Sequence, residues 1–389
     1  MKVVVAHNRY RSTAPSGENA VVDAEIAELR DAGIDVVRAV RSSDDLSLRS
    51  PAGIAAATLG PVYAPRGVPA FRRLLETERP DVVHVHNVYP LLSPWIVRTA
   101  HELGLPVVQT IHNFRHDCVA GTYFRDGRIC TDCSGTRFAH PAVRHGCYRD
   151  SSLQSAPMAV GRTVHRATWL SVDRFLALTP FHADFLRSLG AKNEQIVVRP
   201  TSSPDPGPVI DPPSDDVVFV GRLEVQKGVR VLLDAWSRST ARVRGGRLHL
   251  VGDGPLRREV AAAAANDSTI VAHGLLEPDD VSDKIVASGL VVLPSLWFEG
   301  LPRVLVEAIA RGRAVAVSDF GGLAGALPDE ACWRFTPTAD GIVYVLDMMT
   351  SNHLRAKGRA ARAAYESTYA PAVTLPRLLA VYREVANLS

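Results

Sequence analysis

Short runs of Val and Ile alternate along the chain with stretches whose apolar residues recur at helical spacing. A run that is apolar at every position is typical of a strand buried on both faces of a parallel sheet. The alternation therefore predicts an α/β fold of doubly wound sheets covered by helices. In the first half we expect strands at Val3–Ala6, Val36–Val40, Val82–Val85, Val107–Ile111, Arg174–Leu178 and Ile196–Arg199.

A second series of the same kind begins at Val217. The predicted strands are Val217–Gly221, Arg247–Gly252, Ile270–His273, Leu290–Pro294 and Ala314–Ser318. The clearest helical patterns are Ala20–Ala32, which ends before a C-capping Gly33, then Val229–Ser237, Leu301–Arg311 and the Ala/Arg/Leu-rich stretch Ser351–Leu388.

A proline-rich segment separates the two series. Residues 200–213 contain six prolines in fourteen positions and cannot continue a helix or a sheet for long. A chain of 389 residues also exceeds one comfortable hydrophobic core. We therefore expect an N-terminal domain at 1–199, a linker at 200–213, a second domain at 214–365 and a C-terminal helix at 366–389 that can cross back to the first domain. Two doubly wound domains joined by a hinge form a cleft, where ligands preferentially bind.

Composition and charge narrow the function classes. Residues 1–199 carry 24 Lys and Arg against 19 Asp and Glu, yet no dense basic block is present, which argues against nucleic acid as a partner. The basic front half favours an acidic or membrane-surface acceptor. The first apolar run is too short for a signal peptide, and no segment reaches the roughly 20 apolar residues of a membrane span. We expect a cytoplasmic protein, with peripheral attachment to the inner face of the membrane left open.

The strongest motif for binding is Gly221-Arg-Leu-Glu-Val-Gln-Lys-Gly228, between a predicted strand and a predicted helix. Free backbone N–H groups and the positive end of the helix dipole favour an anion at such a junction. Arg222 and Lys227 add two full charges, which suit a diphosphate leaving group. The alternative is a surface turn with two solvated cations.

Two carboxylates, Glu299 and Glu307, have seven residues between them in EGLPRVLVE. Pro302 fits the first turn of a helix, where its missing N–H leaves nothing unpaired. Glu299 then lies in the preceding loop and Glu307 about two turns inside. A carboxylate there can accept hydrogen bonds from paired ribose hydroxyls. The alternative is one Glu that favours the helix dipole and another on a solvated face.

Taken together, these motifs resemble retaining glycosyltransferase family four of the GT-B superfamily, over nearly the full chain. The matching segments are GRLEVQKG, Glu299…Glu307, LHLVGDGPLRREV, SLWFEGLP, AIARGRAVAVSDFGG and TIHN. The resemblance implies two Rossmann-like domains facing each other across a cleft. Two positions depart from the family pattern, which often has Glu at Gly325 and Asp at Gly289.

The resemblance also implies roles for individual residues. Arg222 and Lys227 would hold the donor diphosphate, and Glu307 would bind the ribose. Glu299 would sit beside the donor sugar and phosphates with the backbone of Gly300 and Leu301. The family's catalytic set then maps onto His112, Arg222, Lys227 and Glu299.

The front domain contributes Gly17 and His112. Gly17, in the first strand-to-helix turn, would let the backbone approach a phosphate or sugar closely, and the resemblance places this turn opposite the donor. Spacing alone favours an ordinary turn with Ser16 as N-cap equally well. His112 ends a predicted strand, and the resemblance places it near the donor sugar, whereas a lone His is more often structural. His84 and His86 also end a strand and are interpreted as cleft-lining or core residues.

Four cysteines, Cys118, Cys130, Cys133 and Cys147, form a C-x11-C-x2-C-x13-C pattern within an insertion at 117–150. Four thiolates could hold a structural zinc, and a cytosolic setting argues against disulfides. Small buried hydrophobic residues and a redox pair are the alternatives.

The predicted reaction is transfer of a sugar from a nucleotide-diphosphate donor to a glycan, lipid-linked or small-molecule acceptor, with retention implied by the resemblance only. No cofactor is required if the cations neutralise the phosphates. A nucleotide-sugar epimerase and a non-catalytic nucleotide-sugar-binding protein remain alternatives. A nicotinamide-dependent dehydrogenase would need GxGxxG after the first strand, which this sequence lacks.

Overall fold

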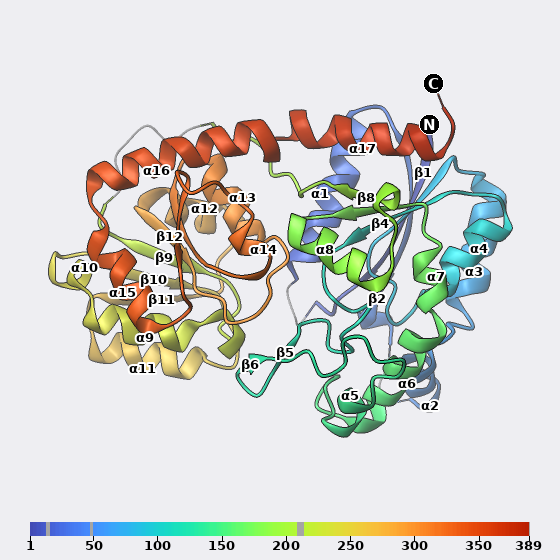
Figure 1. Cartoon of the computed structure of the whole chain (residues 1–389), viewed down its shortest axis with the longest axis horizontal. Coiled ribbons are helices and arrows are strands. Elements are labelled where there is room, and N and C mark those ends of the chain that lie inside the picture. The colour runs from blue at the N-terminus through green and yellow to red at the C-terminus, as the bar shows by residue number, and fades with distance from the viewer. Residues whose placement is uncertain (13–15, 47–49, 208–213, 389) are drawn as a thin grey trace. The chain divides into compact units, whose positions relative to one another are not determined.

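The computed structural model describes residues 1–12, 16–46, 50–207 and 214–388. The chain divides into two compact units. Unit 1 comprises Met1–Tyr123, Cys130–Pro200 and Thr374–Ser389, and unit 2 comprises Phe124–Ile129 and Thr201–Val373. Each unit is built on its own parallel six-stranded sheet with helices on both sides (Figure 1). The predicted α/β class with two doubly wound sheets is confirmed. Residues 208–213 of the predicted linker lie outside the described residues.

The sheet of unit 1 has the order β2-β1-β3-β4-β7-β8. Its central strands are buried at every position, as expected for strands covered on both faces. The strands are β1 (Lys2–Arg9), β2 (Asp35–Ser42), β3 (Val82–Val85), β4 (Val107–Ile111), β7 (Arg174–Ala177) and β8 (Ile196–Val198).

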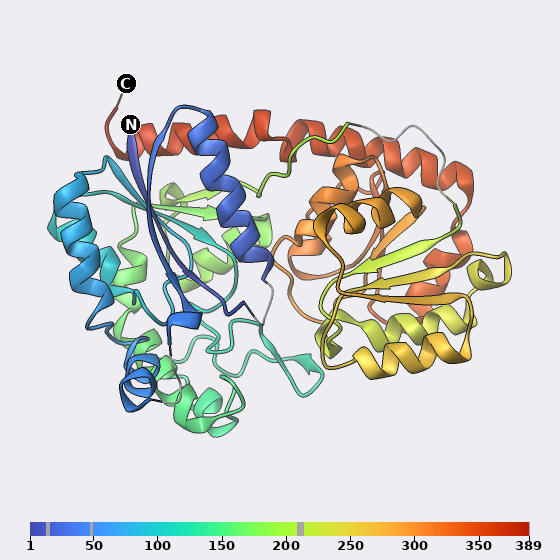
Figure 2. The same cartoon turned by 180° about the vertical axis from the view of Figure 1, so that it is seen from behind.

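Two helices from opposite ends of the chain cover one face of this sheet. α1 (Gly17–Asp31) begins at Ser16, whose side chain caps the helix by accepting a hydrogen bond from the Glu18 N–H. Apolar residues of α1 and of α17 (Pro371–Val385) share one core with β1, β3, β4 and β7, and Figure 2 shows α1 against the sheet. The other helices of unit 1 are α2 (Pro51–Leu59), α3 (Gly67–Glu78), α4 (Trp95–Glu102), α5 (His140–Arg144), α6 (Ser152–Val164), α7 (Arg166–Leu170) and α8 (Pro180–Leu189).

Unit 2 has the sheet order β11-β10-β9-β12-β13-β14. Trp236 of α9 is fully buried in its main core, with α15 packed beside it. The strands are β9 (Val217–Val220), β10 (Leu248–Val251), β11 (Ile270–Gly274), β12 (Leu290–Leu293), β13 (Ala314–Ser318) and β14 (Cys332–Phe335). The helices are α9 (Val229–Arg238), α10 (Thr240–Val243), α11 (Arg257–Asn266), α12 (Pro278–Ala287), α13 (Arg303–Ala310), α14 (Gly321–Ala324), α15 (Ala339–Met348) and α16 (Ser351–Ala364).

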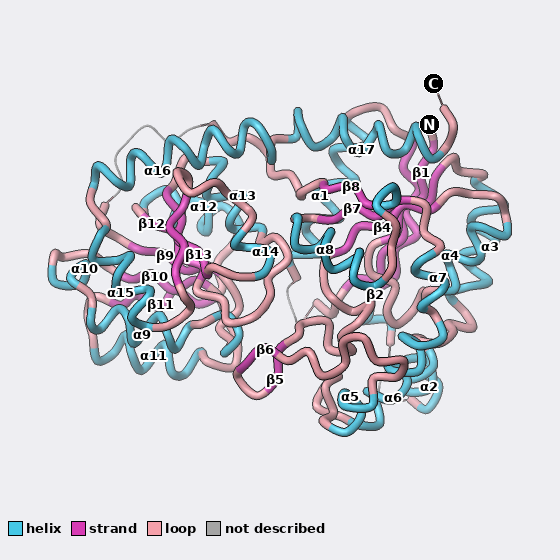
Figure 3. Tube along the Cα trace, in the orientation of Figure 1, coloured by secondary structure: helices cyan, strands magenta, loops and turns pink. Residues whose placement is uncertain are grey.

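Several local predictions differ from the structure. Pro302 is the N-cap of α13 and lies before its first turn, so Glu307 lies little more than one turn inside the helix. The predicted C-terminal helix is two helices, α16 and α17, separated by a π-helical turn at Tyr365–Tyr369. The edge strand β14 and the hairpin of β5 (Phe124–Arg125) and β6 (Arg128–Ile129), visible in Figure 3, lack a Val/Ile run and were not predicted.

Strand order determines where each unit can bind a ligand. In unit 2 the chain lays β10 and β11 on one side of β9 and then returns to place β12 on the other. The connections after β9 and β12 therefore leave the carboxyl edge in opposite directions, which opens a crevice between them. In unit 1 the same reversal lies between β1 and β3. Both junctions are expected ligand sites.

No helix within the described ranges is long and apolar enough to span a bilayer.

Gly228 tests how closely the loops at the unit 2 junction are packed. Gly228 (φ +74°) and Gly274 (φ +69°) are both left-handed, but only a Cβ on Gly228 would meet the Pro294 carbonyl, at 1.8 Å. We expect Gly274→Ala to cost about 1–2 kcal/mol for the left-handed backbone. Gly228→Ala should cost about 1–3 kcal/mol more because of the clash. Urea denaturation measures both, and equal costs would contradict this packing.

Candidate functional site

The loop after β9 is tied to the loop after β12 by backbone contacts. The Leu296 N–H donates to the Gln226 carbonyl at 2.7 Å, and Gly228 packs directly on Pro294. On the other side Gly252, at φ +137°, lies so close to the Gly221 carbonyl that a Cβ would be 1.9 Å from it. The sequence GRLEVQKG therefore forms a rigid turn at the strand-order reversal of unit 2.

Lys227 and Glu299 meet at this junction. The Lys227 Nζ donates to Glu299 Oε1 at 2.6 Å, and the same oxygen accepts from Ser295 Oγ at 2.6 Å and from Trp297 Nε1 at 2.7 Å. The Lys227 ammonium also lies 5.3 Å from the centre of the Trp297 ring, within cation–π range. One oxygen thus receives three donors, and the ammonium is fixed in position.

The electrostatics of this group follow from its burial. Glu299 is 6% exposed. Burial alone would raise the pKa of Glu299, but the Lys227 charge and the three hydrogen bonds hold that pKa below its ordinary value. Glu299 is therefore ionised at neutral pH, and the pair supplies a fixed cation at the crevice.

The other residues predicted for the donor site have different partners. Arg222 lies in the same loop, but its half-exposed guanidinium pairs with Glu224 at 2.7 Å. Glu307 pairs with Arg303 at 2.6 Å, and no described contact joins it to Lys227. Gly300 and Leu301 directly follow Glu299, and the carbonyls of Glu299 and Gly300 lie against Gly322.

In unit 1, His112 follows β4 and lines a cavity of about 320 Å³ at the carboxyl edge of the sheet. The cavity wall also includes His86 and Asn87 after β3 and Glu18 of α1. Gly17 is the first residue of α1, and a Cβ there would meet nothing within 4 Å. The N-cap role considered for Ser16 is present, and no neighbouring atom requires glycine at Gly17.

Buried polar side chains lie next to His112 that no sequence pattern had linked to it. Its Nε2 lies 2.9 Å from His86 Nδ1, and His86 Nε2 lies 3.3 Å from Glu25 Oε1. Glu25 is buried on α1 and pairs with Arg199. Burial, then the neighbouring His86, lowers the pKa of His112 to about 3, so the His112 ring is neutral. The sequence signal that could have identified Glu25 is a charged residue at a core-facing position of α1.

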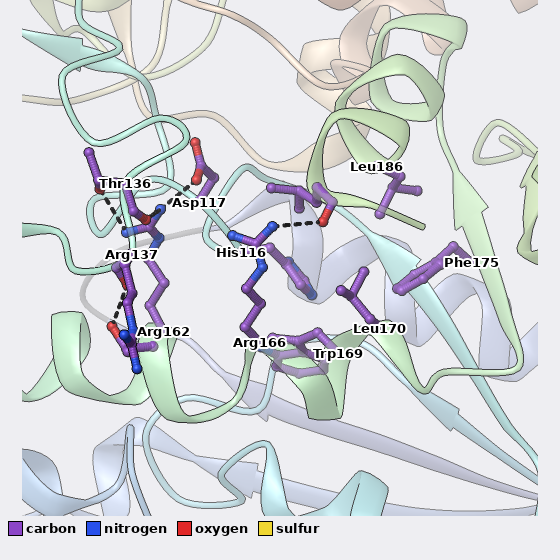
Figure 4. Close-up of a pocket in the computed structure, with 12 residues that line it drawn as sticks. His116, Asp117, Thr136, Arg137, Arg162, Arg166, Trp169, Leu170, Phe175 and Leu186 are labelled. Carbon is purple, nitrogen blue, oxygen red and sulfur yellow. Dashed lines mark hydrogen bonds and ion pairs between the residues drawn. The ribbon is translucent and has the colours of Figure 1, made fainter. Parts of the chain in front are cut away.

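A second cavity of about 470 Å³ adjoins the first, since His116 and Trp169 line both. Figure 4 shows polar groups, including Arg137 and Arg162, along one side and Leu170, Phe175 and Leu186 along the other. Arg166 extends between them and donates to the Leu189 carbonyl at 3.2 Å. Arg162 is neutralised by Asp117 at 2.6 Å, whereas no described carboxylate pairs with Arg137 or Arg166.

None of the four cysteines of the insertion forms a disulfide. Within the described residues, the ligand-type side chains that gather in a group of three or more within 4.8 Å are Glu25, His84 and His86, so the sulfurs do not form a tetrahedral set. Cys133 packs with Val119, Ala139 and Met158, and burial raises its pKa to about 11. The zinc site stays a prediction that elemental analysis of the purified protein can test.

Two family models match the chain. Residues 16–201 match the glycosyl transferase 4-like domain, and residues 214–345 match the glycosyl transferases group 1 model. Together they cover most of both units. The chain belongs to the GT4-like glycosyltransferases of the GT-B fold.

Relatives and solved structures agree with this assignment. This glycosyltransferase is 24% identical to the alpha-D-kanosaminyltransferase of Streptomyces kanamyceticus, over 81% of its own chain and 80% of the relative. It is 29% identical to the phosphatidyl-myo-inositol mannosyltransferase of Mycobacterium tuberculosis, over 44% and 47%. In fold it resembles sucrose-phosphate synthase from Thermosynechococcus elongatus (TM-score 0.71, 17% identity, all of both chains). It also resembles HepE of Anabaena in complex with UDP (TM-score 0.65, 15% identity, 99% and 100%).

The Lys227–Glu299 pair predicts a pH-dependent stability. Lys227→Met leaves the carboxylate buried without its cation, so burial raises the pKa of Glu299 above the roughly 4.3 of an unfolded chain. The folded variant then holds a proton that the unfolded chain has released, and its stability falls as pH rises beyond about 5. We expect the loss relative to wild type to grow between pH 5 and 8 to about 3 kcal/mol.

Thermal unfolding across this pH range measures the effect. The double variant Lys227→Met/Glu299→Gln has no ionisable carboxyl at position 299. Its stability loss relative to wild type should therefore not grow between pH 5 and 8. A loss in Lys227→Met that is the same at every pH would show that the pair is not electrostatically coupled.

Proposed function

We propose that this glycosyltransferase transfers a sugar from a nucleoside-diphosphate α-sugar, with retention, to an acceptor that carries an anionic group. The observation that carries the donor half is the Lys227 ammonium, fixed by Glu299 at the strand-order reversal of unit 2. An ammonium has three N–H donors. One is used by Glu299, which leaves the others for the oxygens of a diphosphate.

The chemistry follows from this fixed charge. As the bond between the anomeric carbon and the phosphate oxygen breaks, negative charge develops on the leaving diphosphate, and Lys227 stabilises it without reorganising. Arg222 adds a second cation once it leaves Glu224. The acceptor oxygen forms the new bond to the anomeric carbon, and its proton passes to a phosphate oxygen of the leaving group. That the HepE structure contains UDP supports a nucleoside diphosphate as the ligand class.

Donor identity is testable by ligand-induced stabilisation. UDP-, GDP- and dTDP-sugars are each added to the purified protein, and the matching donor should raise Tm because it binds only the folded state. The anomeric configuration of the product, read by NMR, tests retention. Isomerisation of the donor sugar without an acceptor would instead indicate an epimerase. Tight donor binding with no transfer to any acceptor would indicate a binding protein.

Lys227 and Glu307 test the donor half by mutation. Lys227→Ala removes the fixed cation, and we expect kcat to fall about 100-fold or more with the fold retained. In the wild type we expect the Glu307 carboxylate to leave Arg303 and bind the ribose of the donor. Glu307→Ala should therefore lose most of the activity. Arg258→Ala, an exposed arginine of α11, is the control and should keep wild-type turnover. Near wild-type kcat in Lys227→Ala would contradict the assignment.

We propose the cavity of Figure 4 as the acceptor subsite. It adjoins the cavity that His112 lines and has an apolar wall at Leu170 and Phe175. It also presents the guanidinium groups of Arg137 and Arg166, neither of which pairs with a carboxylate among the described residues. Guanidinium groups bind phosphate and carboxylate in preference to neutral groups. The combination fits an acceptor with an anionic group next to an apolar part.

Arginine variants test this subsite with the donor saturating. Arg137→Ala and Arg166→Ala should each raise KM for an alkyl-phosphate acceptor about tenfold, the value of one charge-assisted hydrogen bond, with kcat unchanged. The KM for neutral alkyl glycosides should not change. Short sugar phosphates, which lack an alkyl chain, are tested as acceptors alongside the alkyl phosphates to distinguish a soluble from a lipid source of the anionic group. Arg187→Ala, an exposed arginine of α8 paired with Asp184, is the matched control. Equal effects on neutral and anionic acceptors would contradict the proposal.

A further inference from the structure

A buried row of polar groups leads from Arg199 to His112. Arg199 donates to Glu25 Oε2, Glu25 Oε1 lies 3.3 Å from His86 Nε2, and His86 Nδ1 lies 2.9 Å from His112 Nε2. Arg199, Glu25 and His86 are each at most 5% exposed. Among the described residues, no contact of Glu25 Oε1 or of His86 Nε2 meets the full geometry of a hydrogen bond, including the 3.3 Å contact between the two atoms. These two atoms therefore satisfy each other or remain unpaired.

The charge on Glu25 sets the direction of every hydrogen in this row. A carboxylate paired with Arg199 carries no proton and can only accept, so the hydrogen between Glu25 and His86 belongs to His86 Nε2. With Nε2–H as its ring hydrogen, His86 has its lone pair on Nδ1 and accepts from His112 Nε2–H across 2.9 Å. His112 is left with a lone pair on Nδ1, which has no partner among the described residues and can face the cavity that His112 lines.

The neighbouring His84 does not take part in this row. It also lies near Glu25 Oε1, at 3.2 Å, but its Nδ1 lies 2.6 Å from the Tyr382 hydroxyl and its Nε2 lies 2.8 Å from Thr110 Oγ1. Both nitrogens of His84 are therefore used. His84 contacts the same carboxylate without contacting His112, which makes it a matched control.

Glu25, His84 and His86 also place three ligand-type atoms within 4.8 Å of one another. A divalent cation fits poorly here. The fixed charge of Arg199 already neutralises Glu25, and the Tyr382 hydroxyl lies 2.6 Å from His84 Nδ1, the nitrogen that is near Glu25. A second uncompensated charge in a fully buried site is strongly unfavourable. The arrangement favours a chain of hydrogen bonds.

We propose that Glu25 is a positioning residue which, through His86, holds His112 as the Nε2–H tautomer so that its Nδ1 accepts a hydrogen bond from a hydroxyl of the bound sugar. The tautomer follows from unit 1 alone. The hydrogen bond to a sugar rests on the proposed function.

The test is the tautomer of His112 in donor-free protein labelled with ¹⁵N-histidine, read from long-range ¹H–¹⁵N correlations. Wild type should show a protonated Nε2 and a bare Nδ1. Glu25→Leu/Arg199→Met replaces the ion pair by apolar residues of similar size, a change that buried pairs often tolerate. This variant should show a mixture of tautomers and a kcat about tenfold lower, the value of one hydrogen bond, with KM for the donor unchanged.

His84→Gln should keep both the wild-type tautomer and kcat. If the double variant does not fold, His86→Gln tests the same connection. A wild-type His112 protonated on Nδ1, an unchanged tautomer in both variants, or a stoichiometric metal found by elemental analysis would overturn the proposal. Because the tautomer is read without turnover, absence of transferase activity would contradict the proposed function and leave this test intact.

Discussion

The ion pair between Lys227 and Glu299 is the interaction on which the site in unit 2 depends. A lysine side chain is long and strongly hydrated, and a free one at a loop would sample many positions. Here Glu299 fixes the ammonium, and Ser295 and Trp297 fix Glu299. These donors offset the cost of burying the carboxylate. The result is a positive charge placed before any ligand arrives.

Unit 1 uses the same principle for a neutral group. Glu25 and Arg199 form a buried ion pair; Glu25 Oε1 lies 3.3 Å from His86, and His86 lies 2.9 Å from His112. In both units, a buried carboxylate contacts a nitrogen-bearing side chain at the carboxyl edge of a parallel sheet. Lys227 lies in the loop after β9, at the reversal of the unit 2 sheet, whereas His112 follows β4, one strand beyond the reversal between β1 and β3, and contacts His86 after β3.

The sequence was sufficient for the parts of the fold that depend on local hydrophobic pattern. Buried strands such as Val82–Val85 and Val107–Ile111 were predicted with their observed ends, since most of their positions are Val or Ile and each run follows a proline-containing turn. Strand β14 was missed because an edge strand with Trp333 and Arg334 half-exposed carries no Val/Ile run. Motif spacing placed Lys227 and Glu299 in the two loops that meet. It could not show that Arg222 and Glu307 pair with Glu224 and Arg303, because side-chain partners depend on packing. The link from Glu25 to His112 joins three elements distant in sequence and leaves no local pattern.

The central claim is that Lys227 is a preformed binding point for a diphosphate. Titration calorimetry with UDP and GDP, on wild type and on Lys227→Met, tests it without any acceptor or turnover. We expect the nucleoside diphosphate that binds wild type to bind Lys227→Met about 10- to 100-fold more weakly, the range of one or two charge-assisted hydrogen bonds. Equal affinity of the two folded proteins would contradict it.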